Sequence, residues 1–292
     1  MMKPISRACA FLIALLCTLS FAQAQTTTAP DAGRPDAGPL GDDLYVLQLD
    51  ALCGAGKQLS QGCQAIRDRQ ILDASAAPWR AIGRVNFAST SQRQHCTGAL
   101  VSERIVLTAS HCLYNFARKT WIPPQSTRFV AGYQRSTAVA VSQVARYVLH
   151  EAQDPHSRNF KGDFPRDWAL LILKDPIGRE TGFLETLDIG SVSAQNADFA
   201  LAGYPALRPH VLSLAQDCGA PGFSTDRRLM FQRCATMHGD SGAPALALID
   251  GVPKVVGIFT GAVTKQSEFL SVAIPLKSFA AALELERNWE GQ

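Results

Sequence analysis

The feature that most limits the possible folds is a long series of short apolar runs separated by turn residues. The runs are Ala81–Val85, Gly98–Val101, Ile105–Leu107, Arg128–Val130, Ala138–Val141, Trp168–Leu173, Phe199–Leu201, Val211–Leu214, Leu229–Phe231, Ala245–Ile249 and Lys254–Thr260. Many short strands at modest spacing are typical of antiparallel barrels or sandwiches. The sequence therefore predicts an all-β fold. A turn-rich stretch over residues 174–190 lies midway and predicts a division into two β halves.

Only the end of the chain, about residues 276–289, has apolar residues at helical spacing. Five of them fall near one face of a helix: Leu276, Phe279, Ala280, Leu283 and Leu285. This pattern predicts a C-terminal helix after the two β halves.

The first 24 residues have the features of a secretory signal peptide. Lys3 and Arg7 precede an apolar stretch over residues 8–19, and Ala22-Gln23-Ala24 is a small-X-small cleavage site. The stretch is too short to span a bilayer, so we expect a secreted protein, extracellular or periplasmic, with no stable membrane anchor. The sequence predicts a flexible tether over residues 25–43 and an N-terminal arm or a short pro-segment over residues 44–70.

Export gives the cysteines a structural meaning. Of the 8 cysteines, Cys9 and Cys17 lie in the signal peptide, so 8 − 2 = 6 remain. An even number in an oxidising compartment favours three disulfides. Six cysteines allow about 15 connectivities. Their grouping along the chain favours the local pairs Cys53–Cys63, Cys96–Cys112 and Cys218–Cys234. Zinc binding is the competing interpretation, although none of the spacings is a tight Cys-X-X-Cys.

The charge pattern argues against several classes of partner. The net charge is +3 and no run of Lys or Arg exceeds two residues, so we expect no nucleic-acid partner. There is no recognisable calcium loop in the sequence. We therefore expect no cofactor and no metal, with a surface calcium site left open.

A turn at Gly239-Asp240-Ser241-Gly242-Ala243-Pro244 is the first candidate for chemistry. Glycines on both sides of Ser241 allow main-chain amides to crowd around its hydroxyl. Gly-X-Ser-Gly also occurs in ordinary loops, so the meaning of the turn depends on a histidine and a carboxylate placed to meet it.

His111 and Asp167 are the candidates for these partners. His111 follows the apolar run Ile105–Leu107 and precedes a half-cystine, and Asp167 begins the most hydrophobic run of the chain. A serine hydroxyl needs a base to take its proton as it attacks, and histidine titrates in the right range. A buried acid fixes the imidazole tautomer and stabilises the imidazolium. The order His, Asp, Ser matches one of three known chain orders for this geometry.

Three segments of the chain resemble trypsin-like serine proteases of the chymotrypsin fold. They are CTGALVSERIVLTASHC, DWALL and HGDSGAP, and the entry APWRAIGRV is similar to that of the secreted, glutamyl-endopeptidase-like bacterial branch. The resemblance covers about residues 71–292. It implies two six-stranded antiparallel β-barrels, at about 71–178 and 190–275, followed by the helix.

The resemblance also implies roles for individual residues. His111 would be the general base, Asp167 the residue that orients it and Ser241 the nucleophile. The amides of Gly239 and Ser241 would form the oxyanion hole, and each such donor contributes about 3 kcal/mol in related enzymes. Ala243 stands where the family usually has Gly or Ser, and we expect its extra methyl group to be tolerated.

Activation is a second point at which the chain departs from the family pattern. In trypsin-like enzymes the acid before the serine pairs with an N-terminal amine freed by cleavage, which would make Ile71 the new terminus and this protein a zymogen. However, Ile71-Leu-Asp-Ala lacks the usual glycines, and Gln70 is an unusual cleavage residue. Asp240 is therefore either a latch for a freed terminus or a structural acid.

The resemblance places three residues in the specificity pocket: Ala235, Thr236 and Phe259. Ala235 stands at the pocket base where trypsins carry an acid, so a preference for Arg or Lys is not expected. Phe259 stands where glutamate-specific relatives carry a histidine. We therefore expect a small or medium apolar side chain at the cleaved position.

These features together predict a monomeric, secreted serine endopeptidase that hydrolyses protein or peptide substrates through an acyl-enzyme intermediate. The main alternative is a catalytically silent protease-fold binding module, although such modules usually lack one of the three residues. An esterase or lipase would carry Gly-X-Ser-X-Gly and the order Ser, acid, His, which this chain does not.

Overall fold

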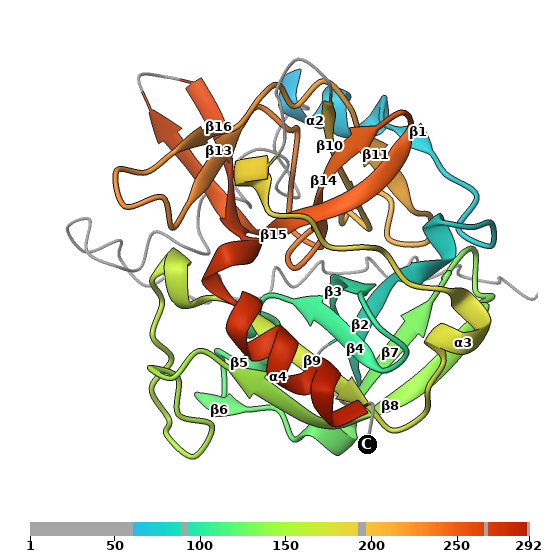
Figure 1. The fold of residues 1–292 in the computed structure, drawn as a ribbon, viewed down its shortest axis with the longest axis vertical. Helices are drawn as coiled ribbons and strands as arrows, with labels where there is room; N and C mark the ends of the chain where they lie inside the picture. Colours follow the sequence, from blue (N-terminus) through green and yellow to red (C-terminus); the bar gives the residue numbers. More distant parts are fainter. Residues whose placement is uncertain (1–60, 89–92, 192–196, 266–267, 291–292) are drawn as a thin grey trace, which may run out of the picture. The chain divides into compact units, whose positions relative to one another are not determined.

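The computed structural model describes residues 61–88, 93–191, 197–265 and 268–290. The predicted signal peptide, the tether and the first part of the arm lie outside these residues. Most of the described chain forms two β assemblies, which apart from one short strand follow one another along the sequence (Figure 1). The predicted all-β class, with a helix at the C-terminal end, is confirmed.

The first assembly is a closed barrel of six antiparallel strands in the order β2-β3-β4-β9-β8-β7. Its strands are β2 (Ile82–Ala88), β3 (Arg93–Leu100), β4 (Ile105–Thr108), β7 (Thr127–Ala131), β8 (Ala140–Leu149) and β9 (Ala169–Leu173). A small hairpin of β5 (Tyr114–Asn115) and β6 (Thr120–Trp121) is inserted in the sequence between β4 and β7. Strand β4 is buried along its whole length, as expected for an uninterrupted apolar run inside a barrel.

The second assembly is an eight-stranded sheet in the order β1-β11-β10-β14-β15-β16-β13-β12. Its strands are β1 (Gln70–Ile71), β10 (Asp198–Gly203), β11 (Ser213–Ala215), β12 (Gly222–Phe223), β13 (Met230–Gln232), β14 (Pro244–Ile249), β15 (Val252–Lys265) and β16 (Glu268–Pro275). The sequence predicted a six-stranded barrel for this half of the chain, at about residues 190–275. The two additional strands, β1 and β12, are two-residue segments at the ends of this order, and such short pairings leave no periodic signal in a sequence.

Strand β1 precedes the first barrel in the sequence but pairs with the second sheet. Gln70 lies opposite Leu214 and Ile71 lies opposite Ser213 in an antiparallel register. The N-terminal arm is therefore attached to the second half of the molecule before the chain enters the first barrel.

The described helices are few and short. The α-helices are α2 (Gln61–Arg67), α3 (Gly178–Thr181) and α4 (Ala280–Glu290), and the 3-10 turns are η1 (Trp79–Ala81), η2 (Ser110–Leu113), η3 (Pro124–Ser126), η4 (Phe164–Arg166), η5 (Ile189–Ser191) and η6 (Leu276–Ser278). None of the helices in the described residues is long and apolar enough to cross a membrane.

The C-terminal helix begins four residues later than predicted, because residues 276–278 form η6 instead. Phe279 and Leu283 of this region are buried, whereas Leu285 is 63% exposed. The helix packs on the first barrel, as Figure 1 shows. Arg146 of β8 pairs with Glu286, and Arg287 donates a hydrogen bond to the Val101 carbonyl at 3.0 Å.

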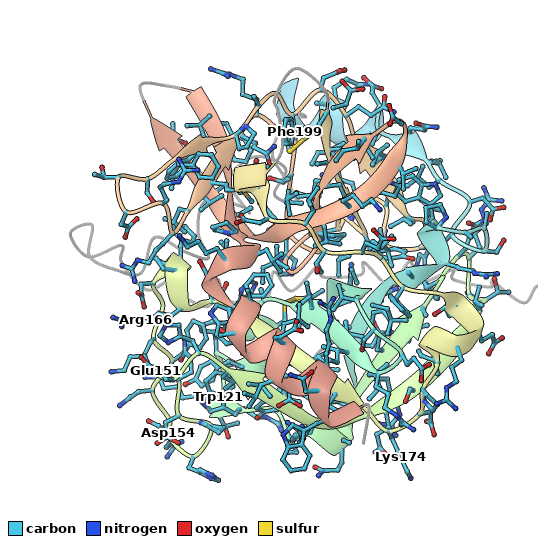
Figure 2. The ribbon with its side chains drawn as sticks, viewed as in Figure 1. Trp121, Glu151, Asp154, Arg166, Lys174 and Phe199 are labelled. Carbon is cyan, nitrogen blue, oxygen red and sulfur yellow. A yellow bond between two sulfur atoms is a disulfide. The ribbon has the colours of Figure 1, made fainter. Side chains whose placement is uncertain are left out.

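Two clusters of buried apolar side chains hold the assemblies together. The larger one includes the barrel interior and side chains from both halves, such as Leu107, Leu170 and Leu246. The smaller one comes from the second half alone. In Figure 2, Trp121 marks the larger cluster and Phe199 the smaller one. Shared burial of this kind fixes the orientation of the strand ends that carry the candidate site.

Candidate active site

His111 and Asp167 lie at the same edge of the first barrel because of the pairing of β4 with β9. Thr108, the last residue of β4, lies opposite Ala169, the first residue of β9. His111 follows in η2, and Asp167 precedes β9 directly after η4. The pairing of β4 with β9 thus brings into contact two residues that are 56 apart in the sequence.

The His111 turn is also tied to the neighbouring strand by a disulfide. Cys112 is bonded to Cys96 of β3, with 6.0 Å between their Cα atoms. The Thr108 hydroxyl donates a hydrogen bond to the Thr97 carbonyl at 2.9 Å. These links restrict the position of the imidazole before any substrate binds.

The Asp167 carboxylate is fully buried and accepts four hydrogen bonds. One oxygen accepts from the Ser110 hydroxyl at 2.8 Å and from the His111 amide at 2.7 Å. The other lies 2.7 Å from His111 Nδ1 and accepts from the Thr260 hydroxyl. Burial raises the pKa of Asp167, and the hydrogen bonds from Thr260, His111 and Ser110 oppose that rise.

The contact with Asp167 assigns the tautomer of His111. An ionised carboxylate can only accept, so Nδ1 carries the proton and Nε2 carries the lone pair. Burial lowers the pKa of His111, and the nearby His238 adds to this effect, so the ring is neutral at neutral pH. A neutral imidazole with its lone pair on Nε2 is the form that a general base requires.

Ser110 and Thr260 were not predicted from the sequence. Thr260 reaches Asp167 because β15 has a bulge between Phe259 and Gly261 relative to β16. Such a bulge re-aims a side chain across the sheet, and a threonine in a strand gives no sign of it. The position of Ser110 directly before His111 was the only available signal.

Ser241 lies in a tight turn that is built by the glycines around it. Gly239 has φ of +95° and Gly242 has φ of +78°, both in the left-handed region. Gly242 also permits a close approach to the His111 loop, since a Cβ there would lie 2.8 Å from the Ala109 nitrogen. The Ser241 carbonyl accepts a hydrogen bond from the Thr97 amide at 2.9 Å.

The Cys112 sulfur lies between the serine turn and the histidine. It is 3.9 Å from His111 Nε2 and 3.8 Å from the Ser241 carbonyl oxygen. Because this sulfur is part of a disulfide, both are packing contacts and not hydrogen bonds. The imidazole of His111 and the backbone of Ser241 therefore share the Cys112 sulfur as a neighbour.

Hydrogen bonds to the neighbouring His238 and Gly239 carbonyls fix the peptide groups around the amides of Gly239 and Ser241. The His238 carbonyl accepts from the Ala206 amide at 2.7 Å, and the Gly239 carbonyl accepts from the Thr97 hydroxyl at 2.8 Å. Among the hydrogen bonds of the described residues, neither the Gly239 nor the Ser241 amide acts as a donor. Two unused main-chain donors beside a serine can bind a developing oxyanion.

Asp240, between these two amides, is buried and ion-paired with Arg69 of the N-terminal arm. Ile71, the candidate new terminus, is 49% exposed and is paired within β1. In the uncut chain, the side chain of Arg69 thus supplies the cation that pairs with Asp240.

The three predicted pocket residues differ in their surroundings. Phe259 is fully buried in the smaller apolar cluster, and its backbone pairs with the serine turn through Gly242 and Ala243. Thr236 is buried, and its hydroxyl makes no hydrogen bond with any described residue. Ala235 is half-buried, and its carbonyl accepts hydrogen bonds from Arg69. The ring of Phe164 lies on Gly261, where a Cβ would be 2.7 Å from Cε1.

Two of the three predicted disulfides are confirmed, Cys96–Cys112 and Cys218–Cys234. Cys63 is also disulfide-bonded. Its predicted partner, Cys53, lies outside the described residues.

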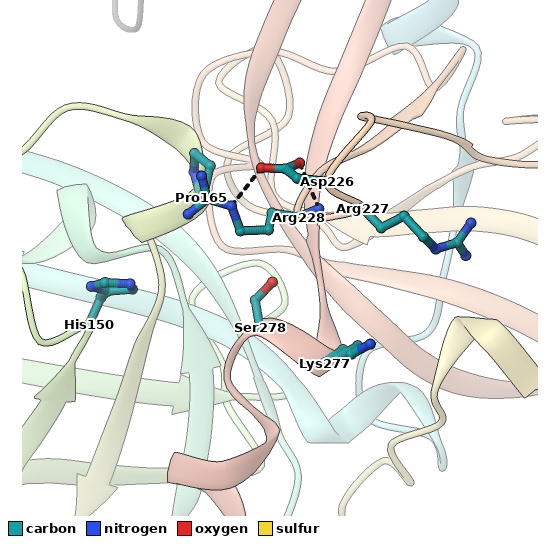
Figure 3. Close-up of a pocket in the computed structure, with 7 residues that line it drawn as sticks. All are labelled: His150, Pro165, Asp226, Arg227, Arg228, Lys277 and Ser278. Atoms are coloured by element: carbon teal, nitrogen blue, oxygen red, sulfur yellow. Dashed lines mark hydrogen bonds and ion pairs between the residues drawn. The ribbon is translucent and has the colours of Figure 1, made fainter.

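A separate pocket of about 240 Å³ is lined by residues of both halves of the chain (Figure 3). It is lined by His150, Pro165, Asp226, Arg227, Arg228, Lys277 and Ser278. Asp226 pairs with Arg228 at 2.7 Å, which leaves the lining basic. It contains none of the predicted site residues.

Comparisons with known proteins agree with this fold. A sequence model of the trypsin family matches residues 71–283. A structure of Glu endopeptidase in complex with MPD has a TM-score of 0.58 and 19% identity, covering 77% of this chain and 97% of that chain.

Two further solved structures have similar folds. Protease Anisep from Arthrobacter nicotinovorans has a TM-score of 0.54 and 16% identity, covering 71% of this chain and 97% of that one. The thermostable serine protease AL20 from an extremophilic microorganism has a TM-score of 0.53 and 15% identity, covering 70% of this chain and 96% of that one.

Proposed function

The chain belongs to the trypsin family of proteases, and from this premise we propose that it is a secreted serine endopeptidase that uses His111, Asp167 and Ser241. The predicted chymotrypsin-like fold is confirmed, and Glu endopeptidase among its structural neighbours fits the predicted bacterial branch. The substrate class that the family implies is protein or peptide.

The first chemical step is attack of Ser241 on a peptide carbonyl. His111 Nε2 takes the hydroxyl proton as the Ser241 oxygen bonds to the carbonyl carbon. Asp167 holds the Nδ1 proton and stabilises the imidazolium that forms. The carbonyl oxygen becomes an oxyanion, and in this proposal the amides of Gly239 and Ser241 donate hydrogen bonds to it.

The remaining steps return the enzyme to its starting state. The imidazolium of His111 gives its proton to the leaving amine as the C–N bond breaks, which leaves an acyl group on Ser241. Water then attacks the acyl carbon while His111 takes a proton from it. Collapse of the second intermediate releases the acid and restores the Ser241 hydroxyl.

The observation that carries the proposal is the hydrogen-bonded pair of His111 and Asp167 next to the Ser241 turn. The pair is 2.7 Å apart, and the acid is held by three further donors. Burial of a carboxylate is unfavourable unless hydrogen bonds or charges compensate it. A binding module without catalysis has no need of a buried carboxylate that is hydrogen-bonded to an imidazole.

Covalent labelling with a fluorophosphonate probe tests the proposal. We expect the mature wild-type protein to be labelled, and Ser241→Ala and His111→Ala to lose labelling and peptidase activity together. Ser75→Ala, which removes an exposed hydroxyl, is the matched control and should label as wild type does. Folded wild-type protein that is not labelled would support the binding module instead.

The proposed preference for a small or medium apolar side chain rests on the pocket base. Ala235 supplies no carboxylate, and the charge that contacts its carbonyl is the Arg69 guanidinium, which is neutralised by Asp240. A cationic substrate side chain would find no partner there. A peptide-library cleavage profile dominated by Arg, Lys or Glu at the cleaved position would contradict this preference.

Export is the remaining part of the proposal. Disulfides such as Cys96–Cys112 are expected in an oxidising compartment, which agrees with the predicted signal peptide. Mass spectrometry of the exported protein should show that residues 1–24 are absent. A cytoplasmic protein that retains Met1 would contradict it.

A further inference from the structure

The contact between Arg69 and Asp240 joins the arm to the residue next to the proposed nucleophile. The guanidinium donates two parallel hydrogen bonds to the carboxylate, Nη1 to Oδ1 at 2.9 Å and Nη2 to Oδ2 at 2.7 Å. The side chains are 1% and 0% exposed. Nε of Arg69 also donates to the Ala235 carbonyl at 3.1 Å. This bidentate geometry is the strong form of an arginine–carboxylate pair.

Asp240 depends on this cation. Its carboxylate is fully buried. Among the described residues, the carboxylate accepts hydrogen bonds only from Arg69 and from the Met237 amide, the latter at 3.0 Å. A buried carboxylate without a counter-charge is strongly unfavourable, so the segment would rearrange to expose it if the cation were removed.

The segment that would rearrange contains the two proposed oxyanion donors. Asp240 lies between Gly239 and Ser241, and its own backbone bonds to Met237 at 3.1 Å and Ala243 at 2.7 Å close the turn. Side chain and backbone of Asp240 thus define the path of residues 237–243. A change in the position of the carboxylate would turn the two amides away from a common point.

Arg69 is held in place from both sides. Before it, helix α2 contributes the buried Ile66 and the disulfide-bonded Cys63. After it, β1 pairs with β11. The Arg69 carbonyl also accepts a hydrogen bond from Arg208 at 3.0 Å. The cation is part of a folded element and not of a loose leader.

The same pairing holds Ile71 in the ladder between β1 and β11. Ile71 lies opposite Ser213 and is half exposed, and the Leu72 amide donates to the Leu212 carbonyl at 3.0 Å. An amine created at Ile71 could reach the carboxylate only if β1 left the sheet and Arg69 left its buried position.

We propose that Arg69 is a positioning residue that takes the place of the N-terminal ammonium, so that the oxyanion hole is formed in the uncleaved chain and is lost if the chain is cut between Arg69 and Leu72. This inference rests on the proposed function, because Arg69 acts only through the Gly239 and Ser241 amides. Residues 61–70 then belong to the mature enzyme and are not a pro-segment.

The chemistry of the cation provides a test that a merely structural role would not pass. A guanidinium stays charged at all accessible pH values, whereas an amine loses its proton in the alkaline range. Arg69→Lys keeps the charge at neutral pH and makes it titratable. Other ionisable groups face the pair, namely Arg208 and the His95 ring behind Gly239, and they are unchanged in the variant.

The experiment measures kcat and KM for a peptide substrate from pH 7 to pH 10.5. The proteins are wild type, Arg69→Lys, Arg69→Gln and the control Arg67→Gln, which alters an exposed arginine of the same arm. We expect Arg69→Gln to lower kcat at least 100-fold with a smaller change in KM. We expect the ratio of kcat for Arg69→Lys to that of wild type to fall reversibly above about pH 9. Arg67→Gln should match wild type.

The N-terminus of the active wild-type protein is determined in parallel, and it should lie upstream of Arg69. An active form that starts at Ile71 would overturn the inference. So would a folded Arg69→Gln with unchanged kcat, or, if that variant does not fold, an Arg69→Lys with the pH profile of wild type. If wild type itself fails to react with the fluorophosphonate probe, the proposed function fails, and the Arg69 role fails with it.

Discussion

At the scale of single residues, the carboxylate of Asp167 is the group on which the proposed chemistry depends most. Thr260 donates to the same oxygen that His111 Nδ1 contacts, so it helps to set the direction of that oxygen. A hydrogen bond to a charged group contributes about 1.5–3 kcal/mol, more than one between neutral groups.

Replacing Thr260 should therefore reduce catalysis without unfolding the protein. In Thr260→Val the shape is kept and the donor is lost, and we expect kcat/KM to fall about 10- to 100-fold, since about 1.4 kcal/mol corresponds to one factor of ten. Steady-state kinetics on a peptide substrate would measure this change. Thr264→Val, at an exposed position of the same strand, is the control. Equal values for both variants would contradict the role of Thr260.

The residues of the site differ in how far they could be predicted. His111, Asp167 and Ser241 stand in local motifs, so the sequence alone was enough to propose them as site residues. Thr260 and Arg69 are not part of any recognisable motif. Thr260 is 93 residues from its partner Asp167 in the sequence, and Arg69 is 171 residues from its partner Asp240. Their roles depend on a bulge in β15 and on the path of the arm, and neither leaves a pattern in the sequence.

At the scale of elements, the C-terminal helix shows how a correct prediction can have incorrect details. Its existence followed from the apolar spacing, but the spacing was counted from Leu276, which lies in a 3-10 turn. An α-helix has about 3.6 residues per turn, or about 100° per residue, so Leu285 lies about 200° from Leu283 within α4. Leu285 therefore lies on the face opposite the buried Leu283 and is exposed, and the prediction that it shares the buried face was wrong.

The same helix gives a prediction on stability. Phe279 is 2% exposed, and its ring centroid lies 5.9 Å from that of Trp168, next to Asp167. Phe279→Ala should lower the free energy of unfolding by about 3–5 kcal/mol, measured by urea denaturation. Leu285→Ala, at an exposed position of the helix, should change it by less than about 0.5 kcal/mol. Similar losses in both variants would mean that the helix is packed differently.

At the scale of the whole molecule, buried histidines make stability depend on pH. Burial lowers the pKa of His95 to about 4, and the charge of Arg84 adds to this, while the hydrogen bond to the Tyr204 carbonyl opposes it. The unfolded chain takes up this proton near pH 6.5 and the folded protein only near pH 4. Stability is therefore full above about pH 6.5 and is lost as the pH falls toward 4.

Urea denaturation at several pH values checks this sign. Between pH 6.5 and 4 the wild-type protein should lose about 2–3 kcal/mol through His95 alone. His95→Gln, whose amide can replace the donor to Tyr204, should reduce that loss. His156→Gln alters an exposed histidine and should leave the slope unchanged. If His95→Gln has the wild-type slope, the acid sensitivity comes from other groups.

Each end of the described chain contacts the half of the molecule that is farther from it in the sequence. Strand β1, which precedes the first barrel, completes the edge of the second sheet, and helix α4, which follows the second sheet, packs on the first barrel. A cut in the connector at residues 174–190 would thus give two fragments, each carrying a segment that belongs to the other. We expect neither fragment to fold fully alone, and the two to regain structure only as a complementing pair. For the same reason, homologous halves from different proteases could be recombined here only if the arm and the helix were exchanged with the half that they contact.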